Sequence, residues 1–142
     1  ELPYRSGAGL TPRPLRRIAS GGELSRVMLA SKVVLGNADG VDTLVFDEVD
    51  AGVGGSTARA LAGVLADLAA THQVIVVTHL AQVAVMADKH YVVSKEPGDV
   101  PQTHLDEVTG EARTAEIARM LSGDQSEASL AHAKQMLEEA RG

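Results

Sequence analysis

Three short motifs that could take part in ATP chemistry follow one another along this 142-residue chain. They are, in order, Ser20–Glu23, Asp47–Glu48 and Thr78–His79. The partner that such motifs need is a phosphate-binding Gly-x-x-x-x-Gly-Lys-Ser/Thr loop, and the sequence does not contain one. We therefore expect half of an ATP-hydrolysing unit. This half would carry the catalytic carboxylate and a surface for a neighbour's nucleotide, but it would lack its own phosphate-binding lysine.

The first motif opens a predicted helix and admits two interpretations. One is a capping box, in which Ser20 and Glu23 each satisfy a free backbone N–H. The other is an anion site, because Gly21 and Gly22 leave the backbone bare at the positive end of the helix dipole. Capping alone does not require two glycines, and each costs about 1 kcal/mol relative to alanine. The sequence leaves both interpretations open.

The acidic pair follows an apolar run at residues 43–46, which predicts a strand buried on both faces. Ligands of open α/β sheets collect at the carboxyl ends of strands. Asp47 could hold Mg²⁺ through its water shell, while Glu48 orients and deprotonates an attacking water. The alternative is a solvated acidic pair in a turn. His79 follows a second apolar run, at residues 74–77, and if the two strands are neighbours it could reach a γ-phosphate near Glu48.

The elements that would position these residues alternate between helix and strand. This order predicts an α/β fold with a mainly parallel sheet flanked by helices. Residues 1–19 hold three prolines and two glycines, so we expect an incoming extended segment and a loop. Helices are predicted at residues 23–35, 57–70, 80–87, 114–121 and 127–140, and strands at residues 43–46, 74–77, 91–93 and 102–108.

A glycine-rich stretch, Gly52–Thr57, lies between a predicted strand and a predicted helix. It resembles a phosphate loop, but no lysine precedes Ser56 or Thr57. Thr57 also stands where a dinucleotide-binding fingerprint requires its third glycine. We interpret the stretch as a flexible turn that starts the next helix.

Composition narrows the classes of protein further. Apolar residues make up 44% of the chain and aromatic residues 2%, so the core must consist of Val, Leu, Ala and Met. The absence of cysteine excludes disulfides, thiolate zinc sites and cysteine nucleophiles from this chain. The apolar runs are far shorter than the ~20 residues that span a bilayer. We expect a soluble, cytoplasmic protein.

The net charge of −6 argues against direct binding to a nucleic-acid backbone, which is usually neutralised by basic residues. The local exception lies at the start of the chain. Its four arginines are Arg5, Arg13, Arg16 and Arg17. In a stretch rich in glycine and proline, they are either solvated loop charges or a small binding patch.

Taken together, the three sites resemble the C-terminal lobe of an ABC-type ATPase head. Ser20–Arg26 resembles the signature motif, Leu44–Glu48 the Walker B strand, and His79 the switch histidine. The chain is more similar still to the RecN family of SMC-like DNA repair proteins, and the similarity covers nearly its whole length. The matching stretches are Ala19–Arg26, Asp47–Gly52, Val77–Ala84 and Ala118–Gly123.

The resemblance implies an organisation and a set of partners. In such heads the Walker A loop and its lysine come from an N-terminal lobe, separated in sequence by a long coiled-coil arm. Two heads then sandwich two ATP molecules. Residues 1–142 would be the C-terminal half of such a head, with an incoming strand or loop at 1–19 and the lobe itself at 20–142. Its partners would be the Walker A lobe, a second head, and DNA reached through the full-length protein, with no membrane involved.

The resemblance also implies roles for individual residues, with ATP and Mg²⁺ as cofactors. Asp47 would serve Mg²⁺, Glu48 would be the general base, and His79 would sense the γ-phosphate. The first motif would contact the nucleotide that is bound on the opposite head, through Ser20, Gly21, Gly22 and Glu23. Gly52 and Gly54 would contact nucleotide as well. Many relatives carry an aspartate at the place of Gly54, and that aspartate helps communication between heads. Whether this loop has the same role here is therefore left open by the sequence.

Two other functions stay possible at this stage. The first is the nucleotide-binding subunit of a transporter, although such signatures usually have glutamine where Glu23 stands. The second is a non-catalytic interaction domain with the same fold, against which the intact Asp47, Glu48 and His79 argue. We expect double-strand break repair by a RecN-like ATPase, and we expect this chain alone to be inactive.

Overall fold

The structure is a computed structural model that describes residues 3–4, 13–14, 21–35, 40 and 42–142. It groups the chain into two compact units, Glu1–Thr78 and His79–Gly142. None of the helices in the described part of the chain is both long and apolar enough to cross a bilayer.

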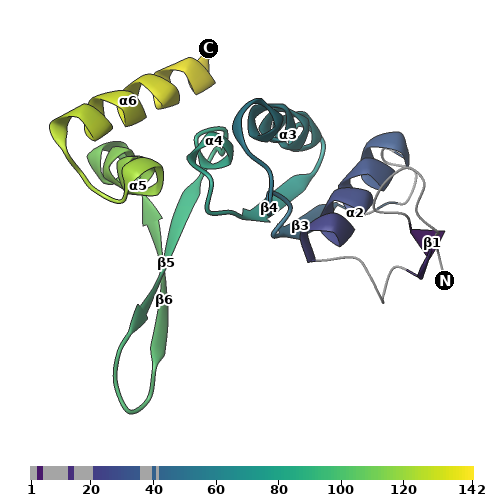
Figure 1. Cartoon of the computed structure of the whole chain (residues 1–142), viewed down its shortest axis with the longest axis horizontal. Helices are drawn as coiled ribbons and strands as arrows, with labels where there is room; N and C mark the ends of the chain where they lie inside the picture. The colour runs from purple at the N-terminus through teal and green to yellow at the C-terminus, as the bar shows by residue number, and fades with distance from the viewer. Residues whose placement is uncertain (1–2, 5–12, 15–20, 36–39, 41) are drawn as a thin grey trace. The chain divides into compact units, whose positions relative to one another are not determined.

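The first unit contains the predicted parallel strand pair. Strand β3 (Thr43–Asp47) pairs in parallel with β4 (Gln73–Val77), with Thr43 opposite Gln73 and Asp47 opposite Val77 (Figure 1). Helix α3 (Gly55–Leu68) connects them, because parallel neighbours need a crossover rather than a tight turn. Both strands lie within a residue of the predicted ranges, and their adjacency is confirmed.

The prediction that both strands are buried on both faces is wrong for this chain. Phe46 is buried on one face of the sheet, whereas Val45, Ile75 and Val77 on the other are 61%, 46% and 55% exposed. Val45 and Ile75 lie directly opposite each other in the register, so their side chains share a face. The sheet has only these two strands, and the described residues of its unit leave that face open.

Helix α2 spans Gly21–Leu35, which places its start two residues before the predicted one. Its buried side chains are those of Leu29 and Lys32. Within the predicted N-terminal loop, β1 (Pro3–Tyr4) pairs antiparallel with β2 (Arg13–Pro14).

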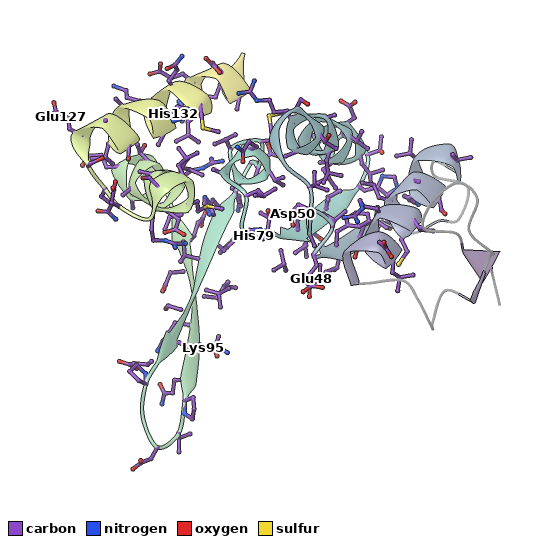
Figure 2. All side chains as sticks on the ribbon, in the orientation of Figure 1. Glu48, Asp50, His79, Lys95, Glu127 and His132 are labelled. Carbon is purple, nitrogen blue, oxygen red and sulfur yellow. The ribbon has the colours of Figure 1, made fainter. Side chains whose placement is uncertain are left out.

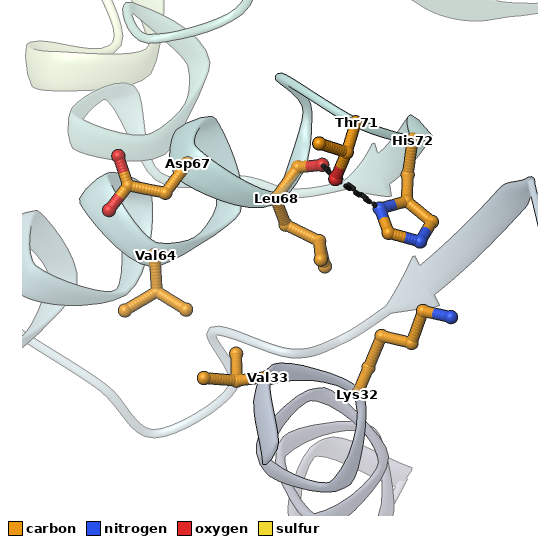
Figure 3. Close-up of a pocket in the computed structure, with 7 residues that line it drawn as sticks. All are labelled: Lys32, Val33, Val64, Asp67, Leu68, Thr71 and His72. Carbon is orange, nitrogen blue, oxygen red and sulfur yellow. Dashed lines mark hydrogen bonds between the residues drawn. The ribbon is translucent and has the colours of Figure 1, made fainter. Parts of the chain in front are cut away.

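A cavity of about 310 Å³ lies where α2 approaches the end of α3 (Figure 3). It is lined by Lys32 of α2, by Leu68 of α3 and by Thr71 and His72, among others. The imidazole Nδ1 of His72 lies 2.8 Å from the Thr71 hydroxyl and 3.3 Å from the Leu68 carbonyl. These contacts satisfy a buried histidine at the C-terminal end of α3. None of the predicted site residues lines this cavity.

The second unit begins with the short helix α4 (Ala81–Ala84) and a β-hairpin. Strand β5 (His90–Glu96) pairs antiparallel with β6 (Gln102–Val108), and the hairpin extends away from the helices of its own unit (Figure 1). The short connection at residues 97–101 explains this pairing, because a connection of this length can only return the chain antiparallel. The description of the sheet as mainly parallel is therefore wrong for β5 and β6, and for the small β1–β2 pair.

Two longer helices complete the second unit. Helix α5 (Gly110–Ser122) ends at Gly123, whose φ of 77° is the left-handed C-cap that glycine favours. Helix α6 (Glu127–Arg141) begins after Ser126, whose side chain accepts from the Ser129 amide. Their buried faces share one apolar core, made of Ala81, Ala84, Val85, Ile117, Ala118, Ala133 and Leu137.

One arginine fastens the end of α4 to α5. The Nη2 of Arg113 donates to the carbonyls of Ala87, at 2.7 Å, and Ala84, at 3.3 Å. A cation at the C-terminal end of a helix is favourable because carbonyls there lack partners. Burial, with a contribution from Arg113, lowers the pKa of His90 below its usual value.

Candidate active site

The carboxyl edge of the β3–β4 pair collects the predicted catalytic residues of the first unit. Asp47 is the last residue of β3 and pairs with Val77, the last residue of β4. Glu48 directly follows β3 and Thr78 directly follows β4, so both residues leave the sheet at the same edge. Figure 2 shows Glu48 at this edge, and both Asp47 and Glu48 are exposed. An exposed carboxylate there can meet a ligand without rearrangement.

Glu48 adopts a backbone conformation that side chains rarely take. Its φ is 57°, and among the described residues it is the only non-glycine with a positive φ. The left-handed region costs an L-residue with a Cβ about 1–2 kcal/mol. Strain of this kind often marks a functional position, because the surrounding structure must hold it in place. Sequence patterns carry no signal for this strain.

Helix α2 is tied directly to the turn that follows β3. The Ser25 hydroxyl donates to the carbonyl of Asp47 at 2.6 Å. The Nη1 of Arg26 donates to the carbonyls of Val49, at 3.1 Å, and Ala51, at 2.9 Å. These three bonds join α2 to the turn that carries the acidic pair. Sequence analysis included Ser25 and Arg26 in the resemblance but assigned no role to either.

The glycine at position 22 is explained by packing. A Cβ added to Gly22 would lie 2.7 Å from the Glu48 carbonyl oxygen and 2.8 Å from the Ala51 Cβ. Both distances are shorter than ordinary van der Waals contacts, so only glycine lets α2 approach the turn. This supplies a reason for Gly22 that neither capping nor anion binding provides. Gly21 starts α2, and Ser20 lies outside the described residues, so their contact with a nucleotide stays a prediction.

We expect Arg26→Met to destabilise the first unit by about 1.5–3 kcal/mol, the usual range for losing hydrogen bonds to a charged donor. Methionine keeps most of the aliphatic length of arginine but cannot donate to the two carbonyls. Urea unfolding of the variant measures the loss. Arg59→Met, at an exposed position of α3, is the matched control and should change stability by no more than about 0.5 kcal/mol. Equal stabilities of the two variants would contradict the anchoring role.

The turn after β3 is closed by its own backbone and glycines. The Ala51 amide donates to the Glu48 carbonyl and the Val53 amide to the Asp50 carbonyl, both at 3.0 Å. Gly52 has a φ of 72°, which glycine adopts without strain, and Gly54 is the extended N-cap of α3. The interpretation of this stretch as a turn that starts a helix is confirmed. Contact of Gly52 and Gly54 with a nucleotide stays a prediction.

His79 is an exposed residue that directly follows Thr78. It is the first residue of the second unit, whereas Glu48 belongs to the first. The proximity of the His79 imidazole to Glu48 therefore stays a prediction. The same holds for its contact with a γ-phosphate.

The acidic residues fit a cation that keeps most of its water. Within the described part of the chain, no three His, Cys, Asp or Glu side chains converge as a ligand set. Mg²⁺ does not need such a set, since it typically binds through one or two carboxylates and retains several waters. Asp47 is exposed at the end of β3, with room for a water shell. Its role as a Mg²⁺ ligand stays a prediction.

Comparison with solved structures finds a chain of similar fold. The chain aligns with a structure from a study of ATP-driven dimerization and DNA-stimulated activation of SMC ATPases. The TM-score is 0.52 at 21% identity, over 95% of this chain and 69% of that one. At this identity the likeness concerns the fold alone, which is α/β.

Sequence comparison finds several RecN proteins that are similar to this chain. The chain is 54% identical over 139 residues to the DNA repair protein RecN of Treponema pallidum, and 53% identical over 137 residues to that of Deinococcus radiodurans. It is 50% identical over 142 residues to RecN of Mycobacterium leprae. These alignments cover 96%, 96% and 99% of this chain, so its similarity to RecN proteins extends over nearly its whole length. No protein-family model matches it.

The share of the relatives that is matched is small. The chain spans about a quarter of the length of the three RecN proteins, 24% in each case. Most of a relative's length thus has no counterpart among these 142 residues. The activity of the whole protein is consequently a matter for proposal.

Proposed function

We propose that this chain is the C-terminal part of the ATPase head of a RecN-type protein that acts in DNA double-strand break repair. It would supply the signature motif, the Walker B carboxylates and the switch histidine for ATP hydrolysis between two paired heads. The observation that carries the proposal is the attachment of α2 to the turn that holds Glu48. Ser25 and Arg26 make three hydrogen bonds to the backbone of residues 47–51.

This attachment suits a shared ATP site. The α2 tip and Glu48 would serve two different nucleotides across a pair of heads, and a rigid link between them would couple the two sites. A movement of one element on binding ATP would shift the other, because hydrogen bonds and a close glycine contact join them. This geometry favours the ATPase over a passive interaction domain, which would not need a strained glutamate at the sheet edge.

The open face of the sheet supports a missing neighbour. Parallel strands are nearly always covered on both faces, yet Val45, Ile75 and Val77 leave one face apolar and exposed. The RecN relatives are about four times as long as this chain. We assign the cover to the N-terminal Walker A lobe of the same protein, which would also provide the phosphate-binding lysine.

The proposed chemistry is transfer of the γ-phosphoryl group of ATP to water, giving ADP and phosphate. Glu48 would orient the attacking water and accept its proton, and Asp47 would hold the waters around Mg²⁺. When bound, the metal neutralises charge on the phosphate oxygens. The residues of this chain would contribute mainly by positioning and by charge, as in other phosphoryl transfers. His79 would hydrogen-bond the γ-phosphate, and the tip of α2 would contact the nucleotide of the opposite head.

Turnover should appear only when the head is complete. We expect the isolated chain to show no ATP hydrolysis above background, because it has no lysine-bearing phosphate loop. Adding or co-expressing the N-terminal lobe should restore phosphate release, measured with a coupled assay. The completed head carrying Glu48→Gln is the control for a contaminating ATPase. Robust hydrolysis by the isolated chain would contradict the proposal. Hydrolysis by the completed head that Glu48→Gln leaves unchanged would contradict it as well.

A further inference from the structure

Asp50 is a buried carboxylate that the proposed chemistry leaves without a task. It lies two residues after Glu48, in the turn that leads to α3 (Figure 2), and it is 1% exposed. Burying a carboxylate is costly unless hydrogen bonds replace its water. A residue of this kind in a turn therefore requires a reason that solubility or loop composition cannot supply.

One carboxylate oxygen joins the ends of the two parallel strands. The Thr78 hydroxyl donates to Oδ2 of Asp50, across 28 positions of sequence. Thr78 directly follows β4, and Asp50 lies in the turn that directly follows β3. The bond thus connects the backbone segment that carries Glu48 with the segment that leads into His79.

The other oxygen shows that the carboxylate is not there for packing alone. Oδ1 of Asp50 is buried and has no hydrogen-bond partner among the described residues. An unpaired buried acceptor costs about 1–3 kcal/mol. An apolar residue of similar size would avoid this cost, so stability alone does not explain a carboxyl group at this position.

We propose that Asp50 is a positioning residue that fixes the strained Glu48 turn against the end of β4 through its hydrogen bond with Thr78. The bond holds the carboxyl ends of β3 and β4 together and so keeps the segment that carries Glu48 in place. The turn also has its own backbone bonds, from Ala51 to Glu48 and from Val53 to Asp50, and the bonds from Ser25 and Arg26 that tie it to α2. The bond with Thr78 ties it to the end of β4. This inference rests on the proposed ATPase function.

The test compares three substitutions in the complete protein. Thr78→Val removes the donor at nearly constant volume, Thr78→Ser keeps the hydroxyl, and Asp50→Asn removes the charge. We expect Thr78→Val and Asp50→Asn to lower kcat for ATP about 10- to 100-fold, with KM changed less than about 2-fold, because positioning acts on the reacting geometry. Thr78→Ser should stay within about 3-fold of the parent. The double variant should lose less than the product of the two single losses, since both substitutions weaken the same hydrogen bond.

A second readout does not depend on ATP turnover. Amide hydrogen exchange at Ala51 and Val53, without nucleotide, should accelerate at least about 10-fold in Thr78→Val but not in Thr78→Ser. Thr103→Val, at an exposed position of the β5–β6 hairpin, is the matched control and should change neither readout. Faster exchange with unchanged kcat would show that the bond between Thr78 and Asp50 holds the turn in place, and it would refute the effect of this bond on catalysis. Unchanged exchange and unchanged kcat in Thr78→Val would overturn the inference itself.

Discussion

Glu48→Gln in the complete protein should lower ATP turnover by about 10²- to 10⁴-fold, the range that general-base catalysis usually contributes. Glutamine preserves the size and hydrogen-bonding capacity of the side chain but cannot accept a proton from water. The strained backbone at this position should be unaffected, because both residues carry a Cβ. Single-turnover measurement of phosphate release separates this loss from a loss of binding.

The same variant should still bind ATP and should still pair with a second head. With hydrolysis blocked, ATP-dependent pairing should persist longer than in the parent protein, which light scattering or sedimentation can follow. Glu138→Gln, at an exposed position of α6, is the matched control and should leave the rate unchanged. A rate for Glu48→Gln equal to that of this control would remove Glu48 as the base.

Gly22→Ala should destabilise the first unit by about 1–3 kcal/mol, the usual cost of overpacking. The added Cβ would meet the Glu48 carbonyl at 2.7 Å and the Ala51 Cβ at 2.8 Å. Neither contact is with the end of a flexible side chain, so α2 or the turn must shift. Because that turn carries Glu48, turnover in the complete protein should also fall.

Gly63→Ala provides the contrast within the same unit. Gly63 lies inside α3, and a Cβ there would meet nothing within 4 Å. Alanine should stabilise this helix by roughly 0.5–1 kcal/mol. Urea unfolding with unchanged slope measures both variants. If Gly22→Ala were as stable as Gly63→Ala, α2 could not approach the turn as closely as the structure shows.

The parallel strand pair could be predicted from the sequence because each strand is a short, continuous apolar run. The runs at 43–46 and 74–77 are the cores of β3 and β4, and the helix between them demands a parallel crossover. Burial on both faces could not be predicted correctly, because it depends on what else covers the sheet. The exposed Val45 and Ile75 follow the same apolar pattern as covered residues would.

The residues of the candidate site divide in the same way. Asp47 and Glu48 could be found because acidic residues at a strand's carboxyl end are a local pattern. The strain at Glu48 could not be predicted, because it is a property of one backbone angle. The bond between Thr78 and Asp50 could not be predicted either, because it joins segments distant in sequence. The observed helix bounds also differ from the predicted ones: α5 starts at Gly110, whereas the predicted helix starts at residue 114. Helix ends depend on capping geometry, which periodicity does not encode.

By itself, the amino-acid sequence determined the order of the elements, the similarity to RecN proteins and the place of Asp47 and Glu48 at the end of a strand, because these follow from local periodicity and short motifs. Only the tertiary structure decided why Gly22 must be glycine, what Arg26 holds and where Asp50 is buried. These facts are contacts between segments some 20–30 residues apart. Such contacts depend on distances of a few tenths of an ångström, which close packing in three dimensions sets and local sequence does not.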